Sequence, residues 1–260
     1  DTFNTAVGYE AGTAITTGVN NVLIGGATGD AITDADNNTA IGNAALSANT
    51  VGSQMTAVGA GALNSVNPAT ATDMWNVAVG VNAGLSVTTG TQNTYIGGLA
   101  GDAATASVEN VAVGYQALSA DTLGSKSVAV GRMALLSQNL TTATDVYNVA
   151  VGHNAGQQVT TGVNNTLIGG LAGDALTDAD HNVAIGYLAL SADTLGSRSI
   201  AIGFGTLDAQ NFTTATDSYN IAIGYTAGGA VTTGIRNTLI GGLSGDALTT
   251  GARNTTLGYA

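Results

Sequence analysis

Short stretches in which aliphatic and small residues alternate recur along the whole chain, each closed by a glycine. The stretch NVAVG at residues 148–152 is representative, with Val149 and Val151 on either side of Ala150. A period of two places the two valines on one face of a strand and the alanine on the other. β-Branched residues at this period, with frequent glycines, disfavour helix. We therefore predict short strands separated by turns of Gly, Asn, Asp and Thr.

Fifteen such stretches occur, and their spacing defines two nested periods. Successive stretches begin 17, 17, 17 and then 21 residues apart, which gives a super-repeat of 72 residues. The super-repeats cover residues 4–75, 76–147 and 148–219, and a partial one covers 220–260. The stretches begin at Asn4, Asn21, Asn38, Met55, Asn76, Asn93, Asn110, Ser127, Asn148, Asn165, Asn182, Ser199, Asn220, Asn237 and Asn254.

A unit of 17 residues is too short for a propeller blade or a helical repeat, but it suits one coil of a β-solenoid. We predict an all-β protein, a parallel β-solenoid (β-roll) of fifteen 17-residue coils, as a single repetitive domain over residues 1–260. The second and fourth positions of each unit are expected to form aliphatic ladders. The third position is Ala in ten of the fifteen units, and we expect this small residue to face a neighbouring chain.

The fifth position of every unit is glycine, which permits a tight turn that a Cβ would block. We predict a structural turn at each of these residues: Gly8, Gly25, Gly42, Gly59, Gly80, Gly97, Gly114, Gly131, Gly152, Gly169, Gly186, Gly203, Gly224, Gly241 and Gly258.

Composition narrows the range of partners. Only 8% of residues are charged and the formal net charge is −12, so the surface should repel nucleic acid and anionic membranes. A hydrophobic fraction of 44% argues against disorder. The chain lacks cysteine, which removes disulfides and thiolate chemistry. No apolar run approaches the length of a membrane span, so we expect no membrane insertion.

The stretches NVAVG, SVAVG and NVAIG resemble the N-S-V-A-I-G head repeats of YadA-like trimeric adhesins. The longer pattern NTAVGYEAGTAITTGVNNVLIGG at residues 4–26 is similar to repeat arrays of phage tail fibres and bacterial surface proteins, which often precede an autocleaved chaperone domain. The resemblance covers nearly the whole chain. It implies a parallel β-roll assembled as a homotrimer, in an extracellular fibre on a virion or on a bacterial cell surface.

Aromatic residues beside the predicted strands are candidates for contacts. One set precedes the first unit of each super-repeat and could seal a groove between neighbouring chains: Phe3, Trp75, Tyr147 and Tyr219. A second set follows the glycine and could contact a glycan or a partner, although covering the edge between coils is the interpretation that we favour: Tyr9, Tyr115, Tyr187, Tyr225 and Tyr259.

Closely spaced aspartates are the best candidates for a metal site. They fall in two matching segments, as Asp30, Asp34 and Asp36 and as Asp174, Asp178 and Asp180. Calcium prefers several oxygen ligands, which such loops can supply. The other copies of this segment, GDAATASVEN and GDALTTGARN, lose the later aspartates, which favours solvated turns with Asx hydrogen bonds. Asp34 and Asp36 could also serve as a glycosidase pair, but their place in regular turns argues against it.

Three other motifs point to structure rather than to chemistry. GGLAGD at residues 169–174 recurs at Gly97 and, as GGLSGD, at Gly241; no helix pattern follows, so it does not match a phosphate-binding loop. His153 and His181 fall in different corners and lack a second histidine for a metal site or a triad. TTG turns begin at Thr16, Thr88, Thr160 and Thr232, which is too sparse for an ice-binding threonine array.

These observations favour a non-enzymatic structural component of an extracellular fibre, either a phage tail fibre or a bacterial surface adhesin. It would act as a rigid shaft or head segment that supports attachment, without a cofactor. Its expected partners are further copies of itself, as a homotrimer or end to end, and a distal receptor or glycan. The alternative hypothesis is a ligand- or glycan-binding or glycan-degrading β-solenoid with an acid-lined groove.

Overall fold

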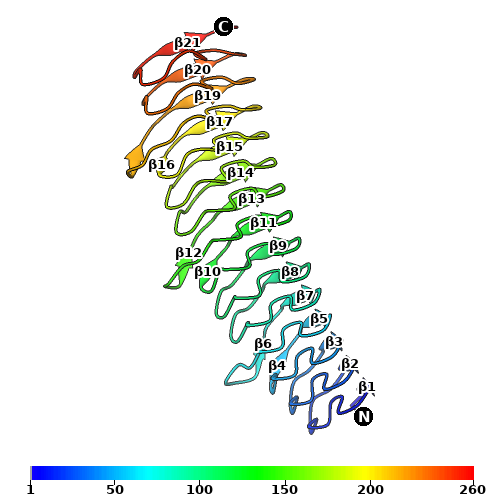
Figure 1. Ribbon diagram of the computed structural model, residues 1–260. Coiled ribbons are helices and arrows are strands. Elements are labelled where there is room, and N and C mark those ends of the chain that lie inside the picture. The colour runs from blue at the N-terminus through cyan, green and yellow to red at the C-terminus, as the bar shows by residue number, and fades with distance from the viewer. Residues whose placement is uncertain (1) are drawn as a thin grey trace. The chain divides into compact units, whose positions relative to one another are not determined.

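The computed structural model describes residues 2–260, and all regular structure in this range is β-strand (Figure 1). The chain divides into two compact units. The first comprises the described residues up to Ser127 together with Asn139–Asp145, and the second comprises Val128–Gln138 and Val146–Ala260. That residues 1–260 form a single domain stays a prediction. Between residues 2 and 260 there is no helix long and apolar enough to cross a membrane.

The first unit contains seven strands of a parallel sheet, each three residues long. In sheet order they are β1 (Thr5–Val7), β2 (Val22–Ile24), β3 (Thr39–Ile41), β5 (Thr56–Val58), β7 (Val77–Val79), β8 (Thr94–Ile96) and β9 (Val111–Val113). Two short parallel pairs accompany them, β4 (Gly52–Ser53) with β6 (Thr72–Asp73) and β10 (Gly124–Ser125) with β12 (Thr144–Asp145).

The second unit contains eight strands of the same kind. In sheet order they are β11 (Val128–Val130), β13 (Val149–Val151), β14 (Thr166–Ile168), β15 (Val183–Ile185), β17 (Ile200–Ile202), β19 (Ile221–Ile223), β20 (Thr238–Ile240) and β21 (Thr255–Leu257). One short pair, β16 (Gly196–Ser197) with β18 (Thr216–Asp217), lies beside them.

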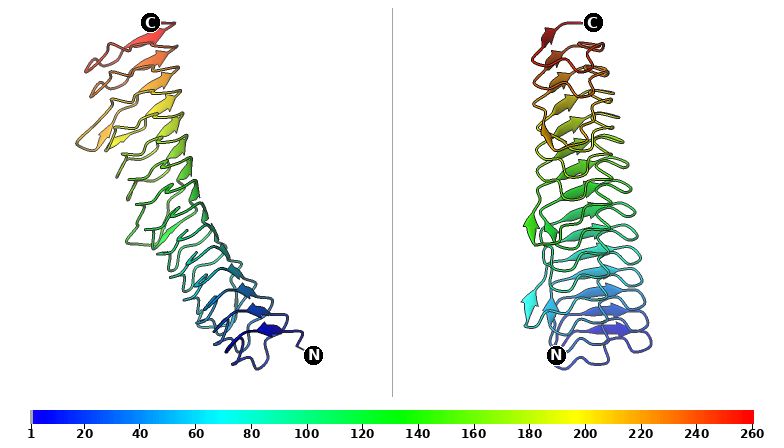
Figure 2. Two further views of the ribbon diagram at one scale, coloured as in Figure 1. Left: turned by 45° about the vertical axis from the view of Figure 1, so that its right-hand side comes forward. Right: turned by 60° about the vertical axis from the view of Figure 1, so that its left-hand side comes forward.

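Each strand pairs in parallel with the equivalent strand of the next coil, so the same unit position stacks from coil to coil. Val149 pairs with Thr166, and Thr166 with Val183. Figure 2 shows the strands stacked within each unit. The predicted parallel β-solenoid of fifteen coils is confirmed, with seven coil strands in the first unit and eight in the second.

The four extra residues of each 21-residue coil form an excursion from the regular path. In the first unit the chain leaves after Asn67 and returns through β6, which pairs with β4. The Thr- and Ala-rich tip of this loop is exposed. The insertion therefore leaves the register of the main sheet unchanged: Thr56 still pairs with Val77.

The side chains of the third position, and not those of the second and fourth, face the interior of the coil. Ala150, Leu167 and Ala184 are fully buried, whereas Ile168 and Ile223 are each 37% exposed. The expectation that the Ala face contacts another chain is therefore wrong. The opposite wall brings its own side chains into this narrow interior, including the buried Leu190, so the sheet has room mainly for alanine.

Large and small residues compensate for each other across this interior. Where the third position is large, as in Tyr95, the opposite wall carries a glycine, Gly101, and a Cβ there would lie 2.4 Å from the Tyr95 ring. In the coil with Ala184 at the third position, the opposite wall instead carries a large residue, Leu190. The volume of the core is thus shared between the two walls, as close packing requires.

Candidate functional surface

The fourth position of the coil strands is aliphatic in every coil and the second is Val, Ile or Thr, and together these side chains form a stripe on the outside of each unit, here called the outer stripe. Because the strands stack in register, Val151 lies beside Ile168 and Ile168 beside Ile185. Fourth-position side chains such as Ile24, Ile96 and Ile168 are 37–39% exposed. Apolar surface that is this continuous marks an interaction site in soluble proteins.

Rows of aromatic side chains border the outer stripe. Trp75, Tyr147 and Tyr219, just before the first position, are 54%, 51% and 47% exposed. After the glycine corner, Tyr187, Phe204 and Tyr225 form a stack, with ring centroids 5.7 and 5.3 Å apart. The exposed rings widen the apolar surface at both of its edges.

The tyrosines that follow the glycine corner also cover the neighbouring coil. A Cβ built on Gly98 would lie 3.6 Å from the Tyr115 ring, and one on Gly170 would lie 3.4 Å from the Tyr187 ring. Each ring therefore lies against the glycine of the preceding coil, in ordinary van der Waals contact. Phe3, Tyr9 and Tyr259 are more exposed, at 76%, 78% and 79%.

A ladder of buried asparagines runs through the first position of the coils. The sequence pattern alone assigns these asparagines no role. The Asn165 side chain accepts a hydrogen bond from the backbone N–H of Asn182 at 2.9 Å. It donates another to the carbonyl oxygen of Ala179 at 2.8 Å. Each asparagine thus links its own coil to the next one. The recurrence of Asn at one position was the available signal.

The six aspartates proposed for calcium do not converge on one point. Asp34 accepts from the Thr17 hydroxyl at 2.5 Å, and Asp36 from the backbone N–H of Val19 at 2.7 Å. Asp178 and Asp180 repeat both contacts with Thr161 and Val163. Within residues 2–260, no group of three or more His, Cys, Asp or Glu side chains could hold a metal ion.

Asp30 and Asp174 differ from the other four aspartates. In each, Oδ1 is buried and lacks a hydrogen-bond partner, and burial raises the pKa of Asp174. The aspartates that follow them accept hydrogen bonds at Oδ1 from Thr hydroxyls and backbone N–H groups. The geometry therefore gives no calcium cage at these loops.

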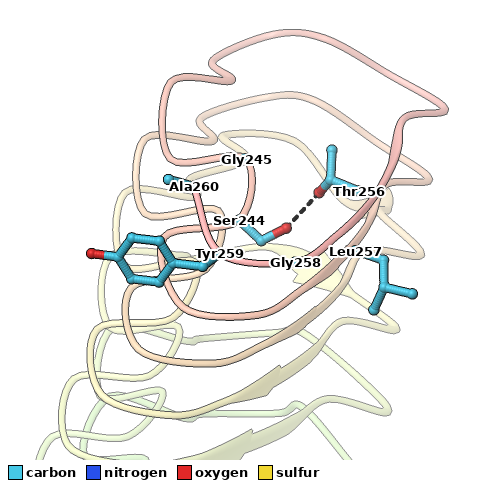
Figure 3. Close-up of a pocket in the computed structure, with 7 residues that line it drawn as sticks. All are labelled: Ser244, Gly245, Thr256, Leu257, Gly258, Tyr259 and Ala260. Carbon is cyan, nitrogen blue, oxygen red and sulfur yellow. Dashed lines mark hydrogen bonds between the residues drawn. The ribbon is translucent and has the colours of Figure 1, made fainter.

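One cavity lies at the last coil, lined by Ser244, Gly245, Thr256, Leu257, Gly258, Tyr259 and Ala260 (Figure 3). The Ser244 and Thr256 hydroxyls hydrogen-bond to each other at 2.6 Å. The lining contains no carboxylate, so this cavity is not the acid-lined groove of the alternative hypothesis.

The remaining motifs lie in regular structure. The Thr16, Thr88, Thr160 and Thr232 hydroxyls donate to carbonyl oxygens of the next coil. His153 contacts the Arg132 guanidinium at 3.3 Å, after the glycine corner, and His181 precedes a strand in a different row. Gly169 and Gly170 close β14 in a turn, and no helix follows them within the described chain.

A buried polar network joins the 21-residue coil of the third super-repeat to the coils on both sides of it. Gln210 donates to Asp193 at 2.6 Å and to Ser199 at 2.9 Å, and accepts from Asn220 at 2.8 Å. Burial raises the pKa of Asp193, and the hydrogen bonds from Gln210 and the backbone oppose this shift. The first super-repeat carries Asn49, Met55 and Val66 at the positions of Asp193, Ser199 and Gln210. The same site can therefore be built from mostly apolar side chains.

No family model, curated protein or solved structure matches this chain.

Proposed function

We propose that the protein is a non-enzymatic structural segment of an extracellular fibre, in which three copies associate in parallel through their outer stripes. The row of partly exposed aliphatic side chains, repeated at the fourth position of every coil, is the observation that carries the proposal. The resemblance to YadA-like head repeats and tail-fibre arrays supports the fibre, the homotrimer and a location on a virion or bacterial surface. Such a segment would act as a rigid shaft or head that supports attachment.

The energetics favour association along the whole stripe. Burying the remaining exposed surface of one such isoleucine, a little over a third of its side chain, contributes on the order of 1 kcal/mol. This gain recurs in every coil, whereas the loss of translational and rotational freedom on association is incurred once per chain. A long stack of similar strands therefore associates more tightly than any single coil could.

The outer stripe also suits a cyclic arrangement. Its two edges differ, because one carries the residues before the strand, such as Tyr219, and the other those after the glycine, such as Tyr225. A heterologous contact that brings one edge of each copy against the other edge of its neighbour closes into a ring. Three parallel copies satisfy this condition and bury the stripe at the centre of the ring.

The test is the mass of the protein in solution. We expect sedimentation equilibrium to give about 76 kDa, three chains of 25.4 kDa. The variant with Ile168→Asp and Ile223→Asp places two carboxylates in the stripe and should sediment as a monomer, because a buried unpaired charge is costly. Thr214→Asp adds a carboxylate on an exposed excursion loop and should leave the mass unchanged. A monomeric wild-type chain would refute the proposal.

A further inference from the structure

The few cations of this acidic chain gather on one edge of the outer stripe. Of the five Lys and Arg residues, four occupy the position immediately before the first residue of a coil: Lys126, Arg198, Arg236 and Arg253. In three consecutive coils of the second unit this position holds Arg198, Tyr219 and Arg236, here called the arginine row. All three residues are exposed and have positive φ.

The opposite edge of the outer stripe carries three aromatic rings over the same part of the chain. They are Tyr187, Phe204 and Tyr225, here called the aromatic stack, and they are 49%, 46% and 60% exposed. Within one chain the arginine row and the aromatic stack lie on opposite sides of the sheet strands, as Arg198 and Phe204 do on either side of β17. Their backbones are therefore separated by roughly 10 Å or more.

The winding of the chain interleaves the two sets along the direction in which the coils stack. Each coil advances by about 4.8 Å, so residues follow one another in height in their sequence order. That order alternates between stack and row: Tyr187, Arg198, Phe204, Tyr219, Tyr225 and Arg236. A rotation about an axis along the stack leaves these heights unchanged. In the proposed ring of three copies, each arginine of the row is therefore level, within one coil spacing, with a ring on the facing edge of the next copy.

Arginine over an aromatic ring is a contact that this chain already makes within one copy. Arg198 lies over the Tyr219 ring at 5.8 Å and pairs with Asp217. Arg236 makes no ion pair with any residue of the described chain, although the residues stacked on both sides of it, Ser218 and Arg253, are described. The Arg236 guanidinium group is therefore available for a ring of another copy.

Cations on one edge and rings on the other change together from one super-repeat to the next. The first super-repeat has glutamine at both arginine positions and no ring at the three stack positions: Gln54 and Gln92, and Asn43, Ala60 and Val81. The second has one cation in the row, Lys126, and one tyrosine in the stack, Tyr115, while Arg132 and His153 take the other two stack positions. Because the two edges are apart within one chain, a contact between copies that joins them accounts for this joint change.

We propose that in the trimer the guanidinium groups of Arg198 and Arg236 pack against the aromatic stack of the neighbouring copy, and that this seam fixes which edges meet. The inference rests on the proposed trimer and names the contact that closes it. A guanidinium group stacks on aromatic faces and is more weakly hydrated than an ammonium group. The seam therefore supplies a specific contact beside the aliphatic side chains of the outer stripe, which are similar in every coil.

The first experiment is a mutant cycle on Arg236 and Tyr225. Arg236→Gln and Tyr225→Val place there the residues found at Gln92 and Val81, and Gln92 has positive φ, so both variants should fold. In sedimentation equilibrium each should raise the dissociation constant of the trimer about tenfold or more, since three contacts between arginine and a ring are lost per trimer. With Tyr225→Val already present, Arg236→Gln should change that constant by less than about twofold, whereas independent sites give effects that multiply.

A second experiment locates the contact without measuring affinity. The chain lacks cysteine, so Arg236→Cys chains and Tyr225→Cys chains are refolded together and treated with a short bis-maleimide. Linked pairs of about 51 kDa, two chains of 25.4 kDa, should form in the mixture and in neither variant alone. No linkage in the mixture, linkage in a single variant, which would show that like edges meet, or effects that multiply in the cycle overturn the seam. A trimeric wild type with any of these results refutes the seam alone, whereas a monomeric wild type refutes the trimer as well.

Discussion

Gly152 offers the sharpest test of how the coils stack. Its φ is +141°, and a Cβ at this position would lie 2.4 Å from the carbonyl oxygen of Gly169 and 2.6 Å from its carbonyl carbon. Both atoms belong to the backbone of the next coil, so no side-chain rotation can relieve the contact. Gly152→Ala, the smallest possible change, must therefore separate the two coils.

The cost of Gly152→Ala has two parts. Alanine in this region of backbone conformation is strained by about 1–3 kcal/mol. Moving the coils apart also weakens the hydrogen bonds from Gly169 N–H to Val151 and from Leu171 N–H to His153, which are 2.8 and 3.0 Å long. Each of these contributes about 0.5–1.5 kcal/mol. We expect a local destabilisation of roughly 2–6 kcal/mol.

Gly258→Ala is the matched control for Gly152→Ala. Gly258 has nearly the same φ, +135°, but no atom lies within 4 Å of its Cβ position, so this change adds strain without collision. Amide hydrogen exchange is the suitable assay, because long repeat arrays do not unfold in a single two-state step. Protection of residues 149–169 should fall in Gly152→Ala. Equal losses of local protection around the two sites would refute the stacking argument.

Two further predictions concern buried polar groups. Asn165→Ala leaves the N–H of Asn182 and the carbonyl oxygen of Ala179 without these partners. We therefore expect the free energy of unfolding to fall by about 2–4 kcal/mol, measured as a lower thermal midpoint. Asn165→Ser, which places at this position the residue found at Ser199, should lower the midpoint less. Because the pKa of Asp193 is raised above its usual 3.8, the folded state favours the neutral carboxyl. The contribution of Asp193 to the free energy of unfolding is therefore complete below pH 3.8. It is lost as the pH rises through the raised pKa. Asp193→Asn with Gln210→Val should flatten this part of the pH profile of the thermal midpoint, and an unchanged profile would contradict it.

The strands and their periods could be read from the sequence because glycine marks the same corner in every unit. A period of two, however, states only that Val149 and Ala150 point in opposite directions; it does not state which of them points inward. The usual expectation that larger aliphatic residues are buried failed here. Residues far along the coil, such as Leu190, fill the interior, and their placement follows only once the coil is closed.

The asparagine ladder illustrates a second limit of sequence reasoning. A polar residue ahead of a strand is typical of a turn, and Asn fits that interpretation. Its structural role depends on a partner 17 residues away, as between Asn165 and Asn182, and this pairing exists only when coils are stacked in register. The contacts of the aspartates have the same origin, since Asp34 meets Thr17 of the preceding coil.

Core packing explains why the coil that begins at Asn148 lies between coils that carry leucine. The coil that begins at Asn148 has Ala150 on the sheet and Gly156 opposite, so it carries no large side chain at either place. A Cβ on Gly156 would lie 2.7 Å from the Leu167 side chain and 3.0 Å from that of Leu135, which shows that leucines of the coils on both sides fill this space. Two such coils in succession would leave a void. The interior therefore requires leucine-bearing coils on both sides of this coil, whereas the fourth position, on the outside, is aliphatic in every coil.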